Sequence, residues 1–343
     1  MIVIMQQGAS EEQINHAVER IEQLGLTPHV SRGQFRSIIG AIGEKLPAHQ
    51  QILEALDGVE RVVPIMKPFK LASREFHAEN SVVTVGAVAI GGPEVAVIAG
   101  PCAVENAQML DRIGRAVARR GAVMLRGGAF KPRTSPYDFQ GLGEEGLKML
   151  RETGDRLGLP VVSEVLAASD VQLVGRYVDM FQIGTRNMQN FQLLKEVGEY
   201  GKPVLLKRGF AATVREYLMS AEYILSRGNR DVVLCERGIK TFENEVRFTL
   251  DVSAVPVIKE YSHLPIIVDP SHAAGRRQWV AALALSGIAA GADGIIVEVH
   301  DRPEEALCDG PQALTPEAFE ELVEHVRKVA AALGRGLAAR NPA

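Results

Sequence analysis

Basic side chains recur where short apolar runs of the sequence end. Six of them follow runs with the composition of buried strands: Arg126, Lys131, Arg133, Arg186, Lys207 and Arg237. A guanidinium group binds two carboxylate or phosphate oxygens at once, whereas a lysine supplies a point charge. Four arginines and two lysines exceed what a single monoanion needs. If the fold gathers them, they predict substrates that carry a carboxylate and more than one phosphate.

A second set of residues offers metal-ligand atoms near the same run ends. Cys102, His272, Glu298 and Asp309 supply one sulfur, one nitrogen and two carboxylates. This mixed set suits a divalent transition metal such as Zn, Mn, Fe or Co, and a mixed site is typical of an ion that acts as a Lewis acid. Each residue also has a plain interpretation, for example Cys102 as a small buried hydrophobe and Asp309 as a turn residue beside Gly310.

Other cysteines and histidines close to these sets have structural interpretations. Cys235 lies inside an apolar run and is expected in the core. Cys308 adjoins the candidate ligand Asp309 and is not included among the predicted site residues. His263 is expected to be structural, and His300 to support the ligands from behind.

These residues can act together only if the ends of the apolar runs meet. After Val82, short β-branched runs alternate with stretches of helical periodicity, which indicates an α/β fold with a parallel sheet. The runs are 95–99, 122–126, 160–164, 179–184, 203–207, 232–236, 265–269 and 294–299. Eight units over about 250 residues predict a (β/α)8 TIM barrel, whose active site lies at the carboxyl ends of the strands. A hairpin over 82–90 is predicted to plug the opposite end.

The first 66 residues predict a domain of their own. Strand 2–6, a helix capped by Ser10, a hairpin of strands 29–31 and 35–42, helix 49–56 and strand 59–66 follow in that order. The order βαββαβ is typical of a ferredoxin-like domain. A polar linker over 67–81 then leads to the barrel of 82–343, which begins with the hairpin.

An alternative is that this domain is only a structural cap. Against that, a separate βαββαβ unit joined by a polar linker is a common means of effector control. His29 and Ser31 face the same side of their predicted strand, because side chains alternate along a strand. They are therefore candidate effector contacts. Polar surface residues on an edge strand would have the same pattern.

Composition and charge exclude several classes of protein. The chain has 343 residues, 46% of them hydrophobic and 23% charged, with a formal net charge of −4, which is ordinary for a globular protein. Residues 1–80 hold 8 Lys and Arg against 10 Asp and Glu, and the remainder holds 30 against 32, so no basic region suggests nucleic acid or an anionic membrane as a partner. Three scattered cysteines, no signal peptide and no apolar stretch of about 18 residues indicate a cytoplasmic protein.

Eight ordered motifs closely resemble the 3-deoxy-D-arabino-heptulosonate 7-phosphate (DAHP) synthase family, in the subtype that begins with a ferredoxin-like regulatory domain. The motifs are Ala99-Gly100-Pro101-Cys102, Leu125-Arg126-Gly127-Gly128, Lys131-Pro132-Arg133-Thr134-Ser135, Gln182-Ile183-Gly184-Thr185-Arg186-Asn187, Leu206-Lys207-Arg208-Gly209, Cys235-Glu236-Arg237-Gly238, Asp269-Pro270-Ser271-His272 and Glu298-Val299-His300. The resemblance covers essentially the whole chain. It implies an aldol-type transferase that condenses phosphoenolpyruvate with D-erythrose 4-phosphate and water to give DAHP and phosphate. This reaction is the first step of the shikimate pathway, which leads to chorismate and the aromatic amino acids.

The same resemblance implies a role for each candidate residue. One divalent metal ion per subunit would be held by Cys102, His272, Glu298 and Asp309. The carboxylate of phosphoenolpyruvate would be bound by Arg126, Lys131 and Lys207, and its phosphate would be surrounded by Glu164, Arg186, Arg237 and the backbone of Gly184 and Thr185. The phosphate of erythrose 4-phosphate would be bound by Arg133 and Thr134. Lys131, Cys102 and His272 are the catalytic candidates, and either Lys131 or a metal-bound water would act as acid or base. Thr185 departs from the family pattern, in which we expect a small alanine.

Two other functions compete with this interpretation. The related 3-deoxy-D-manno-octulosonate 8-phosphate synthase uses arabinose 5-phosphate, but its loop reads Lys-Ala-Asn-Arg-Ser-Ser where this chain has Lys131 to Ser135. A non-catalytic sensor with an inactive barrel should have lost metal or anion residues, and none is missing. The resemblance further implies feedback by an aromatic amino acid such as tyrosine or phenylalanine, and a homotetramer.

Overall fold

The structure is a computed structural model that describes residues 1–33, 36–43, 47–63, 68–133 and 135–339. It divides into two compact units, one of residues 1–79 with 261–263 and the other of residues 80–260 with 264–343. Some residues used in the predictions lie outside the described part of the chain, namely residue 35 of the predicted hairpin, residues 64–66 of the predicted strand 59–66, and Thr134.

The first unit has the predicted βαββαβ order. Its elements are β1 Ile2–Met5, α1 Glu11–Gln23, β2 Thr27–Arg32, β3 Ser37–Ile42, α2 Pro47–Glu54 and β4 Val59–Val63. The strands form an antiparallel sheet in the order β2-β3-β1-β4, which is the ferredoxin-like arrangement. Ser10 and Gln13 form a reciprocal capping box at the start of α1, so the predicted cap is confirmed. The helix buries Ile14, Ala17 and Ile21 against the sheet.

The second unit is a closed parallel barrel. Its strands are β7 Glu94–Gly100, β8 Met124–Arg126, β9 Val161–Glu164, β10 Met180–Ile183, β11 Val204–Lys207, β12 Val232–Glu236, β13 Ile266–Val268 and β14 Gly294–Glu298. Each pairs with the next in parallel, and β14 pairs with β7 over Gly294 to Glu298, which closes the ring. The predicted strands are therefore present, with ends that differ by a residue or two.

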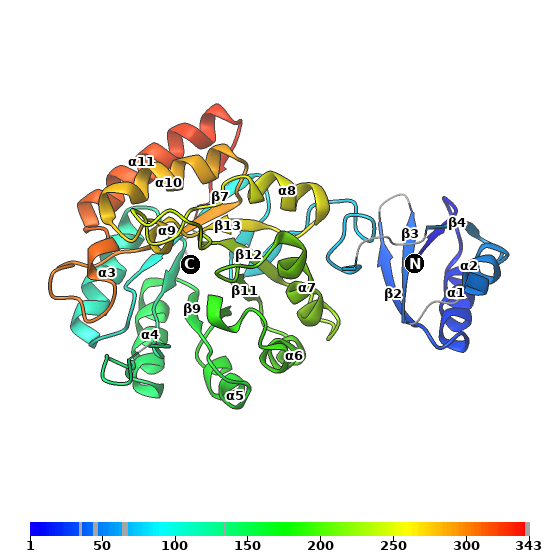
Figure 1. The fold of residues 1–343 in the computed structure, drawn as a ribbon, viewed down its shortest axis with the longest axis horizontal. Helices are drawn as coiled ribbons and strands as arrows, with labels where there is room; N and C mark the ends of the chain where they lie inside the picture. The colour runs from blue at the N-terminus through cyan, green and yellow to red at the C-terminus, as the bar shows by residue number, and fades with distance from the viewer. Residues whose placement is uncertain (34–35, 44–46, 64–67, 134, 340–343) are drawn as a thin grey trace. The chain divides into compact units, whose positions relative to one another are not determined.

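Helices surround the barrel on its outside (Figure 1). They are α3 Ala107–Arg119, α4 Glu144–Leu157, α5 Val171–Gly175, α6 Phe191–Tyr200, α7 Val214–Leu225, α8 Ala254–Tyr261, α10 Arg277–Ala289 and α11 Pro316–Ala332. The short helix α9, Pro270–Ala274, follows β13, and the two-residue strand β15, Gly336–Leu337, pairs with the start of β7. Because β-branched runs and amphipathic helices alternate along the chain, the strands are covered on the side that faces away from the barrel axis.

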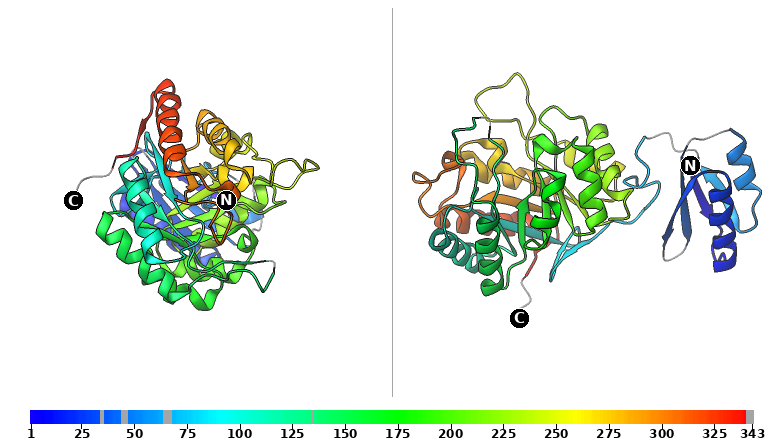
Figure 2. Two further views of the ribbon diagram at one scale, coloured as in Figure 1. Left: turned by 90° about the vertical axis from the view of Figure 1, so that its left-hand side faces the viewer. Right: turned by 90° about the horizontal axis from the view of Figure 1, so that it is seen from below.

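A hairpin closes one end of the barrel, as predicted. Strands β5, Val83–Val85, and β6, Val88–Ile90, send their alternate residues into the same apolar cluster as Ile98, Met180 and Ile296 of the barrel. The hairpin, in cyan, and the loop after β12, in yellow-green, lie at opposite ends of the barrel (Figure 2, right). The carboxyl ends of the strands therefore remain open for a site.

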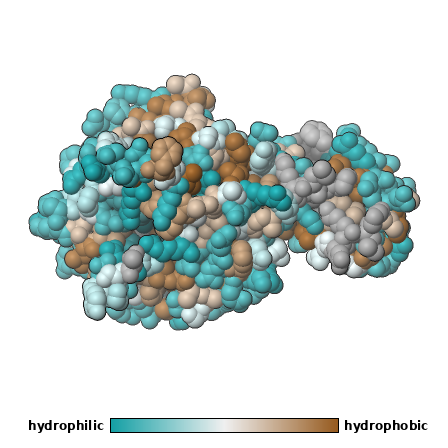
Figure 3. Space-filling view, viewed as in Figure 1, coloured by the Kyte–Doolittle hydropathy of each residue, from teal (hydrophilic) through white to brown (hydrophobic). Residues whose placement is uncertain are grey.

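None of the described helices is long and apolar enough to cross a membrane. On the face of the barrel unit seen in Figure 3, apolar residues are scattered among hydrophilic ones rather than joined into one patch.

Replacing Ile90 by Ala should destabilise the barrel by about 2–5 kcal/mol, because Ile90 is fully buried and its loss leaves a cavity in the plug. The free energy of unfolding is measured by denaturant titration of the full chain, followed by tryptophan fluorescence of Trp279 in α10. Thr84→Ala in the exposed row of the same hairpin is the matched control, and we expect a change within about 0.5 kcal/mol. Equal effects of the two substitutions would contradict the plug.

Candidate active site

A cavity of about 190 Å³ opens at the carboxyl ends of the strands. All six basic residues singled out in the sequence line it, and so do Glu164, Gly184, Thr185, His272 and Asp309. Arg126, Lys131, Lys207 and Arg237 are each less than about a tenth exposed, so their charges point into a small, partly desolvated space. The barrel has therefore gathered the cations that a sequence pattern could only place at strand ends.

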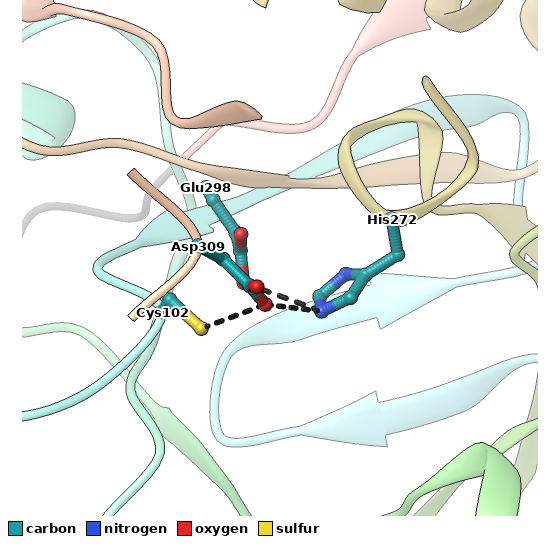
Figure 4. Close-up of side chains that lie close together, drawn as sticks. All are labelled: Cys102, His272, Glu298 and Asp309. Carbon is teal, nitrogen blue, oxygen red and sulfur yellow. Dashed lines mark hydrogen bonds and ion pairs between the residues drawn. The ribbon is translucent and has the colours of Figure 1, made fainter. Parts of the chain in front are cut away.

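The four predicted metal ligands lie together beside this cavity. One ligand atom from each of Cys102, His272, Glu298 and Asp309 lies within 4.8 Å of the other three, and the side chains point toward one another (Figure 4). Cys102 follows β7, His272 lies in α9, Glu298 ends β14 and Asp309 lies beyond it. The four atoms come from adjacent strand ends, which explains how residues so far apart in sequence meet.

His272 is oriented by a buried carboxylate. Asp269 accepts hydrogen bonds from the backbone N–H and from Nδ1 of His272, at 3.0 and 2.7 Å. Because an ionised carboxylate can only accept, Nδ1 carries the hydrogen and Nε2 keeps a lone pair that faces Glu298 and Asp309, at 3.4 and 3.8 Å. Burial lowers the pKa of His272 below its usual value, which favours the neutral form that a metal requires.

Asp269 also accepts a hydrogen bond from Lys207 at 2.5 Å, so one carboxylate serves both the histidine and a cavity cation. Burial alone would raise the pKa of Asp269, but His272 and Lys207 hold it well below its usual range.

Glu298 likewise joins the metal-ligand group to the cavity. Its Oε1 accepts from Arg126 at 2.7 Å, and its Oε2 accepts from Gln312 at 2.7 Å. Burial would raise its pKa, yet the interactions with His272, Arg126 and Lys131 lower it to about 2, so the carboxylate is ionised at neutral pH. Nε of Arg126 is buried and lacks a hydrogen-bond partner among the described residues, which leaves a donor for a ligand.

Two thiols meet at the edge of the group. Sγ of Cys102 lies 3.3 Å from Sγ of Cys308, and Lys131 Nζ donates to Cys102 Sγ at 3.0 Å. Arg133 donates to Cys308 Sγ at 2.6 Å. The hydrogen bond between the thiols, followed by burial, raises the pKa of Cys102, whereas the same bond lowers that of Cys308. Metal binding through Cys102 must therefore release its proton.

Lys131 remains a fixed positive charge in this arrangement. Burial by itself would lower its pKa, but the neighbouring sulfurs of Cys102 and Cys308 raise it above its usual value. The ammonium group also donates to the carbonyl oxygen of Cys102 at 3.1 Å.

Glu164 and Gly184 lie on the opposite wall. Glu164 accepts from Gln182 at 3.3 Å, and a Cβ at position 184 would overlap Oε1 of Glu164. Glycine is therefore required there while Glu164 keeps its position, and Thr185 begins the short 3-10 turn that carries Arg186.

Arg133 reaches the cavity from the loop after β8, where it also pairs with Asp138 at 3.3 Å. Thr134, which the sequence placed beside it, lies outside the described residues.

Several residues of the site were not among the sequence candidates. Asp269 was visible only as part of the Asp-Pro-Ser-His motif, three residues before His272 and at the cap of a short helix. Arg247 donates to Asp309 at 3.2 Å and to Gln312 at 2.8 Å. It lies far along the loop between β12 and α8, so no strand-end signal could identify it. Cys308 was not among the predicted site residues, and its Sγ contacts Sγ of Cys102.

Two of the remaining structural interpretations agree with the observed contacts. Cys235 packs in the barrel core, and His263 Nε2 bonds to the carbonyl oxygen of Leu71 at 2.7 Å. His300 differs, because its Nδ1 accepts from the backbone N–H of Arg302 at 3.0 Å and its ion-pair partners are Glu105 and Asp301, so its support of the ligands stays a prediction.

Comparison with known proteins gives matches over both parts of the chain. Residues 69–334 match the DAHP synthetase I family, and residues 1–67 match the DAHP synthase ferredoxin-like domain. The phospho-2-dehydro-3-deoxyheptonate aldolase of Thermotoga maritima is 53% identical over 334 residues, which are 97% of this chain and 99% of that protein. A 2-dehydro-3-deoxyphosphooctonate aldolase of Syntrophobacter fumaroxidans is 33% identical over 253 residues, which are 68% of this chain and 87% of that protein.

Two solved structures of the Thermotoga maritima enzyme resemble the fold. The crystal structure of its phospho-2-dehydro-3-deoxyheptonate aldolase (DAHP synthase) superimposes with a TM-score of 0.79 and 52% identity, and the match covers 98% of each chain. A truncated form of the Thermotoga synthase gives a TM-score of 0.74 at 52% identity and covers 78% of this chain and 99% of that one.

Replacing Asp269 by Asn should weaken metal binding about 10–100-fold, because the amide cannot hold His272 in the tautomer that leaves Nε2 free. Titration calorimetry of the full chain with Zn²⁺ or Mn²⁺ measures the affinity. Asp251→Asn removes a carboxylate that pairs with Arg208 outside the ligand group, and it should leave the affinity unchanged. Equal affinities of the Asp269 variant and the original chain would rule out this orienting role.

Proposed function

The chain belongs to the DAHP synthetase I family and is a DAHP synthase, and we propose that the cationic cavity is where phosphoenolpyruvate and erythrose 4-phosphate react. The observation that carries this proposal is the gathering of six basic side chains in one cavity next to a possible metal-ligand group. Two phosphates and a carboxylate bring the negative charge that such a cavity requires.

Phosphoenolpyruvate has two anionic groups for the cavity to bind. We assign its carboxylate to Arg126, Lys131 and Lys207, whose charges are buried beside the metal-ligand group. We assign its phosphate to Arg186 and Arg237, with Glu164 and the Gly184–Thr185 backbone nearby. Arg126 and Lys207 are each already paired with a carboxylate, so these two cations orient the substrate more than they neutralise it.

We assign the phosphate of erythrose 4-phosphate to Arg133 and, from the family resemblance, to Thr134. Binding both substrates in one cavity brings C3 of the enol close to the aldehyde carbon, which supplies the proximity term of catalysis. C3 attacks the aldehyde, water adds at C2, and the resulting hemiketal phosphate loses its phosphate group. Because its pKa is raised, Lys131 is protonated at neutral pH and can donate rather than accept a proton.

The residues present suit a divalent metal ion. Cys102, Glu298 and Asp309 supply anionic ligand atoms, and the neutral Nε2 of His272 completes a set in which no donor is far from the others. An ion bound there would act as a Lewis acid toward the aldehyde carbonyl. We propose one divalent ion per subunit, drawn from Mn, Zn, Fe or Co, since each accepts mixed sulfur, nitrogen and oxygen ligands.

Removing the metal with a chelator should abolish consumption of phosphoenolpyruvate in the presence of erythrose 4-phosphate, and added Mn²⁺ or Zn²⁺ should restore it. Consumption is followed by the loss of ultraviolet absorbance of the enol phosphate. Turnover that persists without metal would refute the metal proposal. A parallel assay offers arabinose 5-phosphate as acceptor, and preference for it over erythrose 4-phosphate would instead overturn the choice of aldose.

For the first unit we propose feedback control by an aromatic amino acid such as tyrosine or phenylalanine. The match to a DAHP synthase ferredoxin-like domain supports it, and His29 and Ser31 remain the candidate contacts. Both lie in β2, opposite Gly40 and Ile38 of β3. The expectation of a homotetramer rests on the family resemblance, and that of a cytoplasmic location on the few scattered cysteines.

Replacing His29 and Ser31 together by Ala should raise the tyrosine or phenylalanine concentration for half-inhibition at least about tenfold, because two polar contacts to the ligand are lost. Steady-state assays of the full chain measure it. The control variant is His16→Ala on α1, which should keep the inhibition unchanged. Inhibition that is equally strong in the double variant would remove these residues from the effector site.

A further inference from the structure

The cavity contains a stacked pair of phenylalanine rings that the assignments above leave without a role. Phe210 follows β11, and Phe248 lies in the loop between β12 and α8. Their ring centroids are 5.0 Å apart and their planes differ by 13°. Both rings line the cavity among charged side chains.

Cations surround this pair. The distances to ring centroids are 4.0 Å from Arg237 Cζ to Phe248, 5.3 Å from Arg237 Cζ to Phe210, 5.5 Å from Arg186 Cζ to Phe210, 5.6 Å from Lys240 Nζ to Phe210 and 6.0 Å from Arg247 Cζ to Phe248. At such distances the negative face of an aromatic ring attracts a cation. The aromatic pair therefore lies at the centre of a positively charged wall.

Arg237 and Arg186 differ from Arg126 and Lys207 in their partners. Arg126 pairs with Glu298 and Lys207 with Asp269, whereas no carboxylate among the described residues lies within 4.0 Å of either Arg186 or Arg237. Arg237 is only 3% exposed. Its guanidinium donates to two backbone oxygens, of Gly238 at 3.3 Å and of His272 at 3.4 Å.

The backbone holds the two rings firmly around Arg237. The N–H of Phe248 donates to the carbonyl oxygen of Ala273 in α9 at 2.9 Å, and the N–H of Lys240 donates to that of Phe210 at 2.7 Å. Gly238, with φ of 91°, turns the chain directly after Arg237, and a Cβ there would lie 2.7 Å from Cβ of Phe248. The absence of a side chain at Gly238 therefore allows Phe248 to pack directly against this turn.

We propose that Phe210 and Phe248 are positioning residues that hold Arg237 and Arg186 by cation–π contact in place of carboxylates, and so set the affinity for the substrate phosphate. A ring face attracts a guanidinium without occupying its N–H groups or cancelling its charge, whereas a carboxylate would do both. This inference rests on the proposed function, which assigns the two arginines to the phosphate of phosphoenolpyruvate.

The charge state of Arg237 agrees with this role. Burial lowers its pKa to about 10, so the guanidinium still carries its charge at neutral pH but is poorly solvated. A cation that has lost water and has no carboxylate partner gains most from a ring face and from an incoming phosphate.

Replacing Phe248 by Leu keeps apolar volume but removes the ring face. We expect KM for phosphoenolpyruvate to rise about tenfold, with kcat and KM for erythrose 4-phosphate within about twofold. Phe248→Tyr keeps a ring face and should restore the original KM. The matched control is Phe191→Leu, which breaks the Phe191–Tyr223 stack beside Lys195, outside the cavity, and should change none of the three constants.

A second measurement separates electrostatics from packing. Phenylalanine analogues with one, two and three ring fluorines at position 248 keep nearly the same shape while the ring face becomes less negative. We expect the dissociation constant of phosphoenolpyruvate, from calorimetry with the metal-loaded full chain, to rise step by step along the series. A constant value along the series would overturn the inference.

Arg237→Ala distinguishes failure of this inference from failure of the proposed function. If it leaves KM for phosphoenolpyruvate unchanged, the phosphate assignment and the inference both fall. If it raises KM while Phe248→Leu and the fluorinated series do not, only the inference is overturned. A rise in all three supports both.

Discussion

Buried positive charge at one end of the barrel is the constraint on which the site depends. Arg126, Lys131, Lys207 and Arg237 are nearly inaccessible, and a buried charge is costly unless something compensates it. Glu298 compensates Arg126, and Asp269 compensates Lys207. These two carboxylates also face His272. The same pair of side chains therefore neutralises the substrate-binding cations and orients the metal-ligand group. Neither half of the site can be changed without disturbing the other.

The barrel can tolerate these buried charges because the apolar core that stabilises it and the charged residues of the site lie in different parts of the fold. Apolar side chains of β5, β6 and the barrel strands fill the interior toward one end, while the charged residues lie at the strand ends on the other. The hydrogen-bonded ring of strands fixes the spacing of the strand ends, so ion pairs between neighbouring strands form with little conformational freedom left to lose.

Much of this could be predicted from the sequence because the signals are local. Alternating apolar runs and helical stretches indicated the barrel, a Ser10 cap indicated α1, and basic residues at the ends of runs indicated the cavity. The features of the site that were not predicted from the sequence depend on contacts between segments that lie far apart in the chain. Arg247 reaches Asp309 and Gln312 from a long loop, and the contact between Cys102 and Cys308 spans most of the barrel sequence. The partner that Asp269 finds in Lys207 comes from another strand end, and no local pattern encodes it.

Asp309 has the only non-glycine backbone with positive φ among the described residues, at 55°. Aspartate and asparagine tolerate this left-handed conformation better than most residues do. Asparagine would keep the backbone but lose the charge, glycine would keep the backbone but lose the ligand atom, and glutamate would keep the charge but fit the backbone poorly. No single conservative replacement preserves both the left-handed backbone and the charged ligand atom, so we expect substitutions at this position to be poorly tolerated. A homologue without Asp309 would need a different loop conformation to supply the same ligand atom.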